Sequence, residues 1–332
     1  VIGERTIVNV IVQHAEPDHS GGFLKFMKDY PNARPYASNA GVGIMLKQYF
    51  KSYDFQRVKT GDTLSTGRYT LTFVEMPMIH WPDNMLTYVA EQKIAFSNDA
   101  FGQHIASYDI FDDAHGAAKC IDRAKDYYAN IVMPYGMQVA NKLKQIQDMN
   151  LDIDMIAPAH GIIWRSYLPE LFQANEDFAT FKAVDKAVIV YESVWKHTQM
   201  MAEALAEGMG RNGICVKIFK CSMTSPAIIQ KELLDAKAVL VGSGNYNNAM
   251  AGSIAAFLEK LITCKVKNKK GLGFGSYGWA NLVTKEINAR LGKAGITLLN
   301  DEVVSQNYTP SEADLDALME LGKQIAEEIK AM

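Results

Sequence analysis

Four potential metal ligands lie within six residues near the start of the chain: His14, Glu16, Asp18 and His19. Because they nearly alternate along the chain, neighbouring side chains can point into one site. Two imidazoles with two carboxylates favour a harder, redox-active metal such as iron over the thiolate or all-histidine sites that suit zinc. The alternative is a solvated turn, since His, Asp and Glu are common on protein surfaces. The rest of the sequence favours a metal site, because it supplies further ligands in comparable positions.

Each further ligand follows an apolar segment with the character of a strand. His80, Asp99 and His160 come at or just beyond the carboxyl ends of three such segments. With the strand before the first group, these strands are predicted over residues 7–12, 69–75, 93–98 and 155–158, and rigid strand ends can direct ligands into one cluster. Taken singly the signals are weak, because a lone histidine after a strand is more often structural and Asp99 could cap a helix. Together they predict two metal ions with a bridging carboxylate, held by His14, Glu16, Asp18, His19, His80, Asp99 and His160.

The order of these ligands resembles the metallo-β-lactamase fold, whose usual motif is His-x-His-x-Asp-His with a later His, Asp and His. This chain has Glu16 where the second histidine would stand. That replacement, together with segments 80–85 and 97–104, resembles the flavodiiron proteins, which include the rubredoxin:oxygen oxidoreductases and the A-type flavoproteins. The resemblance implies one iron held by His14, Glu16 and His80, and a second held by Asp18 and His160 with Asp99 bridging the pair. His19 is included as a further ligand, because it ligates in some family members and swings away in others.

Other polar residues near these segments are expected to support the site without binding metal. Trp81, Asp83 and Asn84 are candidates for its wall. His104 could orient a ligand by hydrogen bonding, whereas His115 follows two aspartates and is expected at the surface.

The start of the chain departs from the resemblance. The metallo-β-lactamase fold normally places several strands before the first ligand motif, and here only residues 7–12 precede it. We therefore expect the first domain to be N-terminally incomplete, with one face of its first sheet open.

The character of the sequence changes after Arg165, where a polar, helical stretch leads to a domain boundary at Val184. Residues 187–191 form a continuous apolar run of the kind found in parallel sheets. Apolar strands at 215–219, 238–242 and 271–275 alternate with helical segments, which predicts an open, doubly wound parallel sheet. The expected fold class is thus α/β and α+β. A metallo-β-lactamase-like αββα domain occupies residues 1–183, and a flavodoxin-like domain occupies residues 184–332.

Three loops at strand ends of the second domain predict an FMN site. Ser193 and Thr198 bracket a loop that enters a helix, where free N–H groups favour a phosphate. The loop lacks the glycines of dinucleotide and P-loop motifs, and it resembles the phosphate loop of flavodoxin. Two glycine- and aromatic-rich loops resemble the flavin-ring loops, although the first departs from the family's usual Ser-Pro-Thr. The alternative is that their aromatics serve only the core or an interface. The predicted FMN contacts are Ser193, Val194, Trp195, Lys196, His197, Thr198, Ser243, Gly244, Asn245, Tyr246, Asn247, Asn248, Ser276, Tyr277, Gly278 and Trp279.

The bulk properties exclude several classes of protein. The net charge of −3 does not suit a nucleic-acid-binding surface, and no apolar run approaches the roughly 20 residues needed to span a bilayer. The first residues lack the order of a signal peptide. The four cysteines show no CxxC pairing and are expected to be small buried residues in a reducing cytosol. We therefore expect a cytoplasmic protein that binds neither nucleic acid nor membrane.

The resemblance implies an oxidoreductase that reduces dioxygen to water, nitric oxide to nitrous oxide, or both, at a di-iron site with electrons relayed through FMN. It also implies a head-to-tail homodimer, or a tetramer, in which the flavin of one chain lies beside the iron of its partner. Electrons would come from a separate donor such as rubredoxin or a reduced deazaflavin. Two alternatives remain open: a zinc metallohydrolase fused to a flavodoxin-like electron-transfer module, and an electron carrier with an inert first domain.

Overall fold

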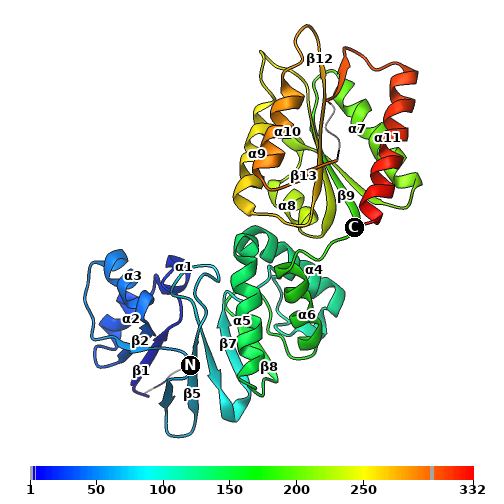
Figure 1. Cartoon of the computed structure of the whole chain (residues 1–332). Coiled ribbons are helices and arrows are strands. Elements are labelled where there is room, and N and C mark those ends of the chain that lie inside the picture. Colours follow the sequence, from blue (N-terminus) through cyan, green and yellow to red (C-terminus); the bar gives the residue numbers. More distant parts are fainter. Residues whose placement is uncertain (1–2, 4, 300–302) are drawn as a thin grey trace. The chain divides into compact units, whose positions relative to one another are not determined.

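The computed structural model describes residue 3 and residues 5–299 and 303–332 (Figure 1). Contacts divide the chain into two compact units, Val1–Thr180 and Phe181–Met332. The sequence placed the boundary between residues 183 and 184, and the first strand of the second unit begins at Val184. Each unit has its own sheets and its own buried core.

The first unit contains two β-sheets. One is parallel, in the order β1-β2-β3, and the other is mixed, in the order β4-β5-β6-β7-β8, with only β7 and β8 pairing in parallel. The strands are β1 (Asn9–Val12), β2 (Arg34–Ser38), β3 (Gln56–Val58), β4 (Thr63–Ser65), β5 (Thr70–Glu75), β6 (Met85–Val89), β7 (Ile94–Asn98) and β8 (Met155–Pro158). The strands predicted to precede ligands therefore correspond to β1, β5, β7 and β8.

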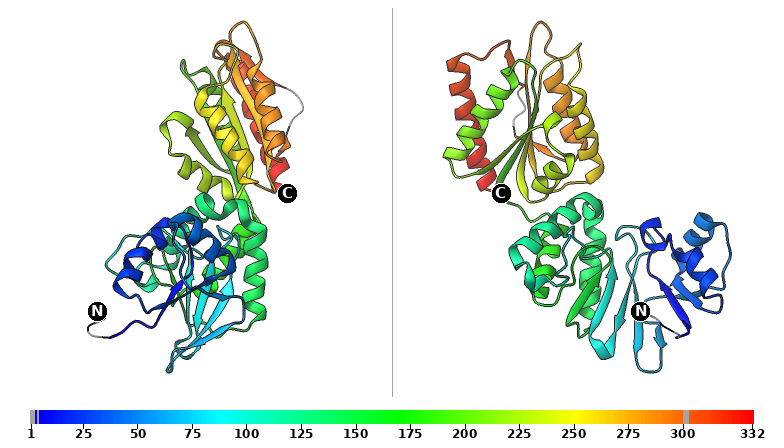
Figure 2. Two further views of the ribbon diagram at one scale, coloured as in Figure 1. Left: turned by 90° about the vertical axis from the view of Figure 1, so that its left-hand side faces the viewer. Right: turned by 180° about the vertical axis from the view of Figure 1, so that it is seen from behind.

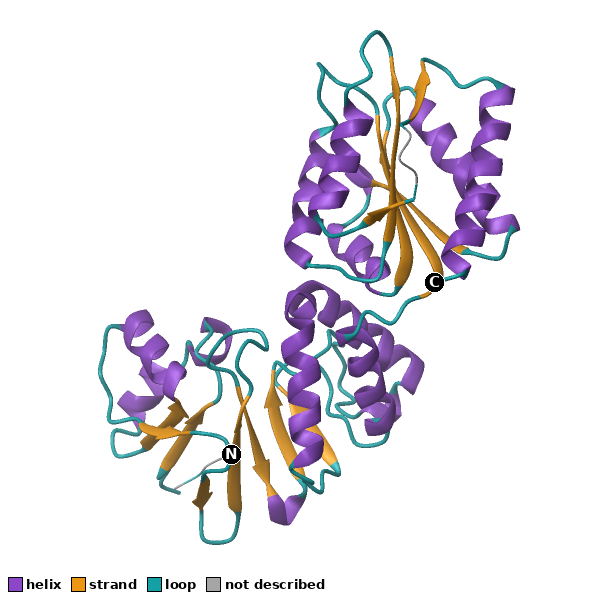
Figure 3. Cartoon of the chain, in the orientation of Figure 1, coloured by secondary structure: helices purple, strands orange, loops and turns teal. Residues whose placement is uncertain are grey.

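Helices cover the outer faces of both sheets, as Figure 3 shows. Beside the first sheet lie α1 (Pro17–Ser20), α2 (Phe23–Asp29) and α3 (Asn39–Tyr49). Beside the second lie α4 (Ala117–Tyr127), α5 (Gly136–Asp148) and α6 (Leu168–Ala179). A π-helix at Tyr128–Val132 and short 3₁₀ turns at Ala90–Gln92, Asp112–Ala114 and Met133–Tyr135 complete the unit.

The alternation along β1 explains the layered packing. Val10 and Val12 pack with the buried residues of α2 and α3, whereas Ile11 packs on the opposite side with Phe73 of the second sheet. This two-residue period places one strand between two apolar layers. The rings of Tyr36 and Phe73 stack with centroids 6.3 Å apart, so the two sheets are in direct contact. The unit is thus an αββα sandwich.

The second unit is built on one parallel sheet in the order β10-β9-β11-β12-β13, with β14 pairing with β12. The strands are β9 (Val184–Glu192), β10 (Cys215–Lys220), β11 (Ala236–Ser243), β12 (Lys270–Tyr277), β13 (Thr297–Leu298) and β14 (Val304–Asn307). The helices are α7 (His197–Arg211), α8 (Pro226–Leu234), α9 (Gly252–Cys264), α10 (Val283–Lys293) and α11 (Glu312–Lys330), with a 3₁₀ turn at Cys221–Met223.

Helices lie on both faces of this sheet. In Figures 1 and 2, α7 and α11 cover one face and α9 and α10 the other. The chain runs from β9 to β10 on one side and then to β11 on the other, which creates a switch point at the carboxyl ends of β9 and β11. Ligands of doubly wound sheets bind at such a point.

The structure bears on the predictions about the cysteines and about membrane-spanning segments. Cys120 and Cys264 are buried, but Cys215 is exposed, so the expectation of four buried cysteines was wrong. Cys215 lies on the edge strand β10, where one side of the strand has no neighbour to cover it. None of the helices in the described part of the chain combines the length and apolar character needed to cross a bilayer.

Candidate functional site

Four of the predicted metal ligands from three strand ends form one group. His14 Nε2 lies 3.2 Å from Glu16 Oε2 and 3.2 Å from Asp99 Oδ2. His80 Nε2 lies 3.1 Å from the same Glu16 oxygen and 3.5 Å from the same Asp99 oxygen. These residues follow β1, β5 and β7, so strands far apart in the sequence bring their ligands together.

The remaining predicted ligands form a second group around the other oxygen of Asp99. His19 Nε2 lies 3.0 Å from Asp99 Oδ1, and His160 Nε2 lies 3.3 Å from it. Asp18 Oδ2 is 3.5 Å from each of these two imidazole nitrogens. His19 therefore faces the cluster, and the Asp99 carboxylate joins the two groups.

The arrangement fits two metal ions better than a network of hydrogen bonds. His19 Nε2 and Asp99 Oδ1 are both buried, and neither has a hydrogen-bond partner despite their short separation. A buried polar atom without a partner is costly, whereas an imidazole lone pair and a carboxylate oxygen converging on one point are suitable metal ligands. The donor set of nitrogen and carboxylate oxygen fits iron.

The electrostatics of the cluster also favour a cation. Burial opposes a charge on His14, but the hydrogen bond to Asp83 and the charges of Asp83 and Asp99 raise its pKa. Burial would raise the pKa of Asp99, yet the neighbouring His19, His14 and His80 lower it. The carboxylates thus draw positive charge into a buried site, a role that metal ions can fill.

Asp83 and Gln103 hold two of the ligands in place. Asp83 lies 3.1 Å from His14 Nδ1 and accepts a 2.6 Å hydrogen bond from the Ala15 amide. A carboxylate on the second ring nitrogen fixes the tautomer and leaves Nε2 free to bind metal. The side chain of Gln103 pairs with both backbone groups of Ile162, at 2.8 and 2.9 Å, and its backbone N–H donates to the His160 carbonyl at 3.2 Å.

Glycine is required at the His160 loop. Gly161 has φ of +88°, and a Cβ there would overlap Gln103. Sequence reasoning considered His104 for an orienting role and missed Gln103. The buried glutamine follows no local pattern, because its partners lie about sixty residues away. His104 is exposed and packs its ring on Tyr127, with centroids 5.1 Å apart.

Tyr127 is a second residue that the sequence did not identify. Its ring lies 5.8 Å from that of His160, and only 4% of the residue is exposed. Burial raises the pKa of its hydroxyl, and the charges of Asp99, Glu16 and Asp18 raise it further. The tyrosine therefore keeps its proton beside the metal ligands.

In the second unit, the three predicted loops line one pocket of about 450 Å³. Its size lies within the usual range for small-molecule sites. Ser193, Val194, Trp195, His197, Thr198, Gly244, Asn245, Tyr246, Ser276, Tyr277, Gly278 and Trp279 line it, together with Tyr308, which the sequence did not identify. The Thr198 and Ser276 hydroxyls lie 2.8 Å apart and join two of the loops.

Four predicted FMN contacts do not line the pocket: Lys196, Ser243, Asn247 and Asn248. The Ser243 hydroxyl is occupied in shaping its own loop, since it accepts from the Ala251 amide at 3.0 Å. Asn247 and Asn248 have positive φ angles and form the tip of a two-residue hairpin between Tyr246 and Ala249.

One observation indicates that the pocket fits a flavin. Asn245 lines it, and its Oδ1 atom is buried without a hydrogen-bond partner, while its Nδ2 donates to the Ala280 carbonyl. An unpaired acceptor beside a pocket suits a ligand with an N–H group, which the flavin ring has. The N-terminus of α7 and the hydroxyls of Ser193 and Thr198 provide donors for a phosphate.

Comparison with known proteins finds a family match for each of the two units. Residues 1–161 match the ODP family of β-lactamase-like domains, and residues 189–322 match flavodoxin. The nitric oxide reductase of Moorella thermoacetica is 41% identical over 322 residues, covering 96% of this chain and 80% of that protein.

Solved structures show the same architecture. The rubredoxin oxygen:oxidoreductase of Desulfovibrio gigas has a TM-score of 0.95 at 33% identity, over 98% of this chain and 82% of that one. The flavodiiron protein of Giardia intestinalis has a TM-score of 0.93 at 26% identity, over 98% of this chain and 80% of that one. The first family match begins at residue 1 and so does not support the predicted loss of N-terminal strands.

A metallo-β-lactamase-like domain with a cluster of metal ligands, followed by a flavodoxin-like domain, defines a two-domain class of oxidoreductases. Identity and coverage together place the sequence within one family of that class. The chain belongs to the flavodiiron proteins.

Proposed function

We propose that this protein reduces dioxygen to water, nitric oxide to nitrous oxide, or both. The observation that carries the proposal is the pair of ligand groups that share Asp99, each with two imidazoles and a second carboxylate. A protein of this family with that site is suited to hold two metals around a small diatomic substrate. The Moorella relative is named nitric oxide reductase and the Desulfovibrio relative rubredoxin oxygen:oxidoreductase, which supports both gases.

The proposed metals are two irons. His14, Glu16 and His80 would hold one, Asp18, His19 and His160 the other, and Asp99 both. When bound, the di-iron centre supplies the place where the gas is reduced, and FMN supplies electrons singly.

The protein's own side chains prepare this site. The Asp83 carboxylate keeps a proton on His14 Nδ1, so His14 Nε2 presents its lone pair. The Tyr127 hydroxyl stays protonated at neutral pH and can donate a hydrogen bond beside Asp99. Burial of Asp99 and His14 excludes water from their surroundings and strengthens these interactions.

We propose FMN as the ligand of the pocket in the second unit, with residues 1–183 as the di-iron domain and 184–332 as the FMN domain. The phosphate would lie at the loop from Ser193 to Thr198, and the ring would lie near Asn245, Tyr246 and Trp279. Lys196, Ser243, Asn247 and Asn248 stay in the proposed set of FMN contacts, and they also shape the loops around the pocket.

Partners follow from the family resemblance. We propose a head-to-tail homodimer, or a tetramer, that receives electrons from a rubredoxin or a reduced deazaflavin. Trp195 and Trp279 support contact with another molecule near the flavin, because they are 79% and 93% exposed at the edge of the pocket.

Metal and flavin content of the protein purified without oxygen tests the proposal. About two irons per chain and one equivalent of FMN support it, and stopped-flow mixing with each gas then separates the two activities. Zinc in place of iron would favour the metallohydrolase alternative. FMN without any metal would leave an electron carrier.

A further inference from the structure

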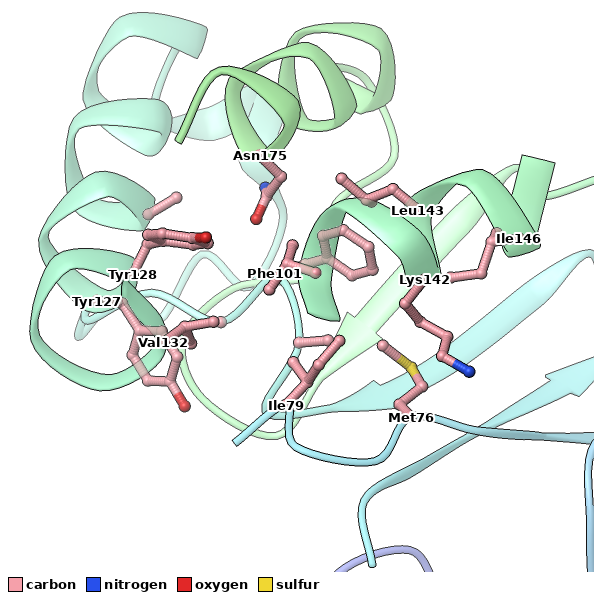
Figure 4. Close-up of a pocket in the computed structure, with 14 residues that line it drawn as sticks. Met76, Ile79, Phe101, Tyr127, Tyr128, Val132, Lys142, Leu143, Ile146 and Asn175 are labelled. Atoms are coloured by element: carbon pink, nitrogen blue, oxygen red, sulfur yellow. The ribbon is translucent and has the colours of Figure 1, made fainter. Parts of the chain in front are cut away.

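A cavity inside the first unit is not explained by the ligand set or by the flavin pocket. It measures about 20 Å³, taken as the space open to the centre of a water-sized sphere. That is enough for a small guest, since one water needs roughly 10–15 Å³ by the same measure. The loop after β5, α4, the π-helix, α5 and α6 all contribute to its wall (Figure 4).

The wall of this cavity is almost entirely apolar. Ile79, Phe101, Val132, Val139 and Leu143 line it and are all buried. Lys142 contributes its aliphatic stem, because its ammonium donates to Gln145 at 2.6 Å and points away from the apolar residues in Figure 4. Apolar cavities stay dry and take up apolar guests such as xenon or benzene.

One side of the cavity is shared with the metal centre. Ile79 lines the cavity and is joined directly to His80. Tyr127 lines it with its ring, which also lies 5.8 Å from that of His160. Gly102 allows this approach, because a Cβ there would stand 3.3 Å from the Tyr127 ring and 2.9 Å from the Asp99 carbonyl.

The other end carries an unused hydrogen-bond donor. The Tyr128 hydroxyl is buried and has no hydrogen-bond partner, and only 3% of the residue is exposed. In Figure 4 its side chain and that of Asn175 point toward one another across this end. Tyr128 begins a π-helix, Tyr128–Val132, and such bulges frequently occur at functional sites.

We propose that this cavity holds the apolar diatomic substrate, dioxygen or nitric oxide, and that the gas reaches the metals between Ile79 and Tyr127. The inference rests on the proposed function for the identity of the gas. A neutral diatomic gains little from water, so an apolar wall favours it, and the single donor of Tyr128 suits its weak acceptor atoms. The same apolar wall disfavours the entry of water and of charged molecules, because they would lose hydrogen bonds that the wall does not replace.

Xenon tests the binding part without any turnover. Crystals of the full chain, loaded with iron and FMN and pressurised with xenon, should show a xenon atom between Phe101, Val132 and Val139. Val139→Leu adds a methylene to the cavity and should abolish that peak. An empty cavity in the native protein under xenon, or ordered water in its place, would overturn the proposal.

Kinetics test the delivery part with a matched control. Val139→Leu should lower kcat/KM for the gas by about tenfold, the lower end of the effect of one methylene in an apolar pocket. Val58→Leu is the control, because Val58 is 7% exposed against 5% for Val139, lies in the same unit and does not line the cavity. An unchanged kcat/KM in Val139→Leu, or an equal fall in the control, would contradict delivery through the cavity.

Xenon binding by a protein that reduces neither gas would contradict the proposed function and still support the cavity as a gas site.

Discussion

The Asp99 carboxylate illustrates how much of this site depends on a single side chain. Only 1% of the residue is exposed, and each of its oxygens faces one group of ligands. The histidines on both sides keep the carboxylate ionised. They lower its pKa by more than burial raises it. Loss of its charge should therefore affect both metals and not one alone.

Asp99→Asn tests this at nearly constant volume. The amide removes the negative charge and one of the two acceptor oxygens, so we expect iron to fall from about two to below about one per chain. Metal analysis after anaerobic purification measures it. Asp113→Asn is the matched control, because Asp113 is an exposed carboxylate paired with Arg165 at 2.8 Å. Retention of both irons in Asp99→Asn would refute the bridging role.

Asp83 should act on one metal only. Its carboxylate contacts the ring of His14 and the Ala15 amide, which both belong to the ligand-bearing segment that follows β1. Removing an outer partner of a ligating histidine typically weakens metal binding by about 10- to 100-fold. We expect Asp83→Asn to weaken one iron by that factor, measured by competition with a chelator. Equal weakening of both irons would contradict the assignment.

At the scale of elements, the strands could be predicted and the supporting contacts could not. Apolar runs ending in His14, Asp99 and His160 are local patterns, and β1, β7 and β8 are formed where those patterns lie. Gln103 and Tyr127 act on ligands from other elements, across sequence separations that no local period encodes. Asn247 and Asn248 illustrate a related point, because the sequence predicted them as flavin contacts and they do not line the pocket. Their turn chemistry places them at a hairpin tip, although the loop as a whole faces the pocket.

Gln103 connects two such elements and provides a prediction. Gln103→Leu would leave both backbone groups of Ile162 without their partner, at a cost of about 2 kcal/mol or more in unfolding free energy. The loop carrying His160 should loosen as well, so iron should be lost first from the group containing that histidine. Urea unfolding and metal analysis measure the two effects. Gln173→Leu on the exposed face of α6 serves as the control and should change stability by less than about 0.5 kcal/mol.

At the scale of the whole molecule, each cofactor site is built from residues of one unit. All seven proposed metal ligands precede Thr180, and all residues that line the flavin pocket follow Phe181. A ligand stabilises the folded form of whatever binds it, by an amount set by its concentration relative to its dissociation constant. Each cofactor should therefore act directly on the stability of one unit.

This separation predicts the response to removing each cofactor. FMN at about 100 times its dissociation constant adds about 2.7 kcal/mol to the unit that binds it, so flavin-free protein should show an earlier transition for Phe181–Met332. Removal of iron by a chelator should instead lower the transition of Val1–Thr180, where buried carboxylates and histidines would be left to balance one another. Scanning calorimetry can assign the transitions, with flavin fluorescence marking the second unit and iron absorbance the first. Both transitions moving equally on loss of either cofactor would contradict the division of the sites between the units. It would mean instead that binding in one unit is coupled to folding of the other.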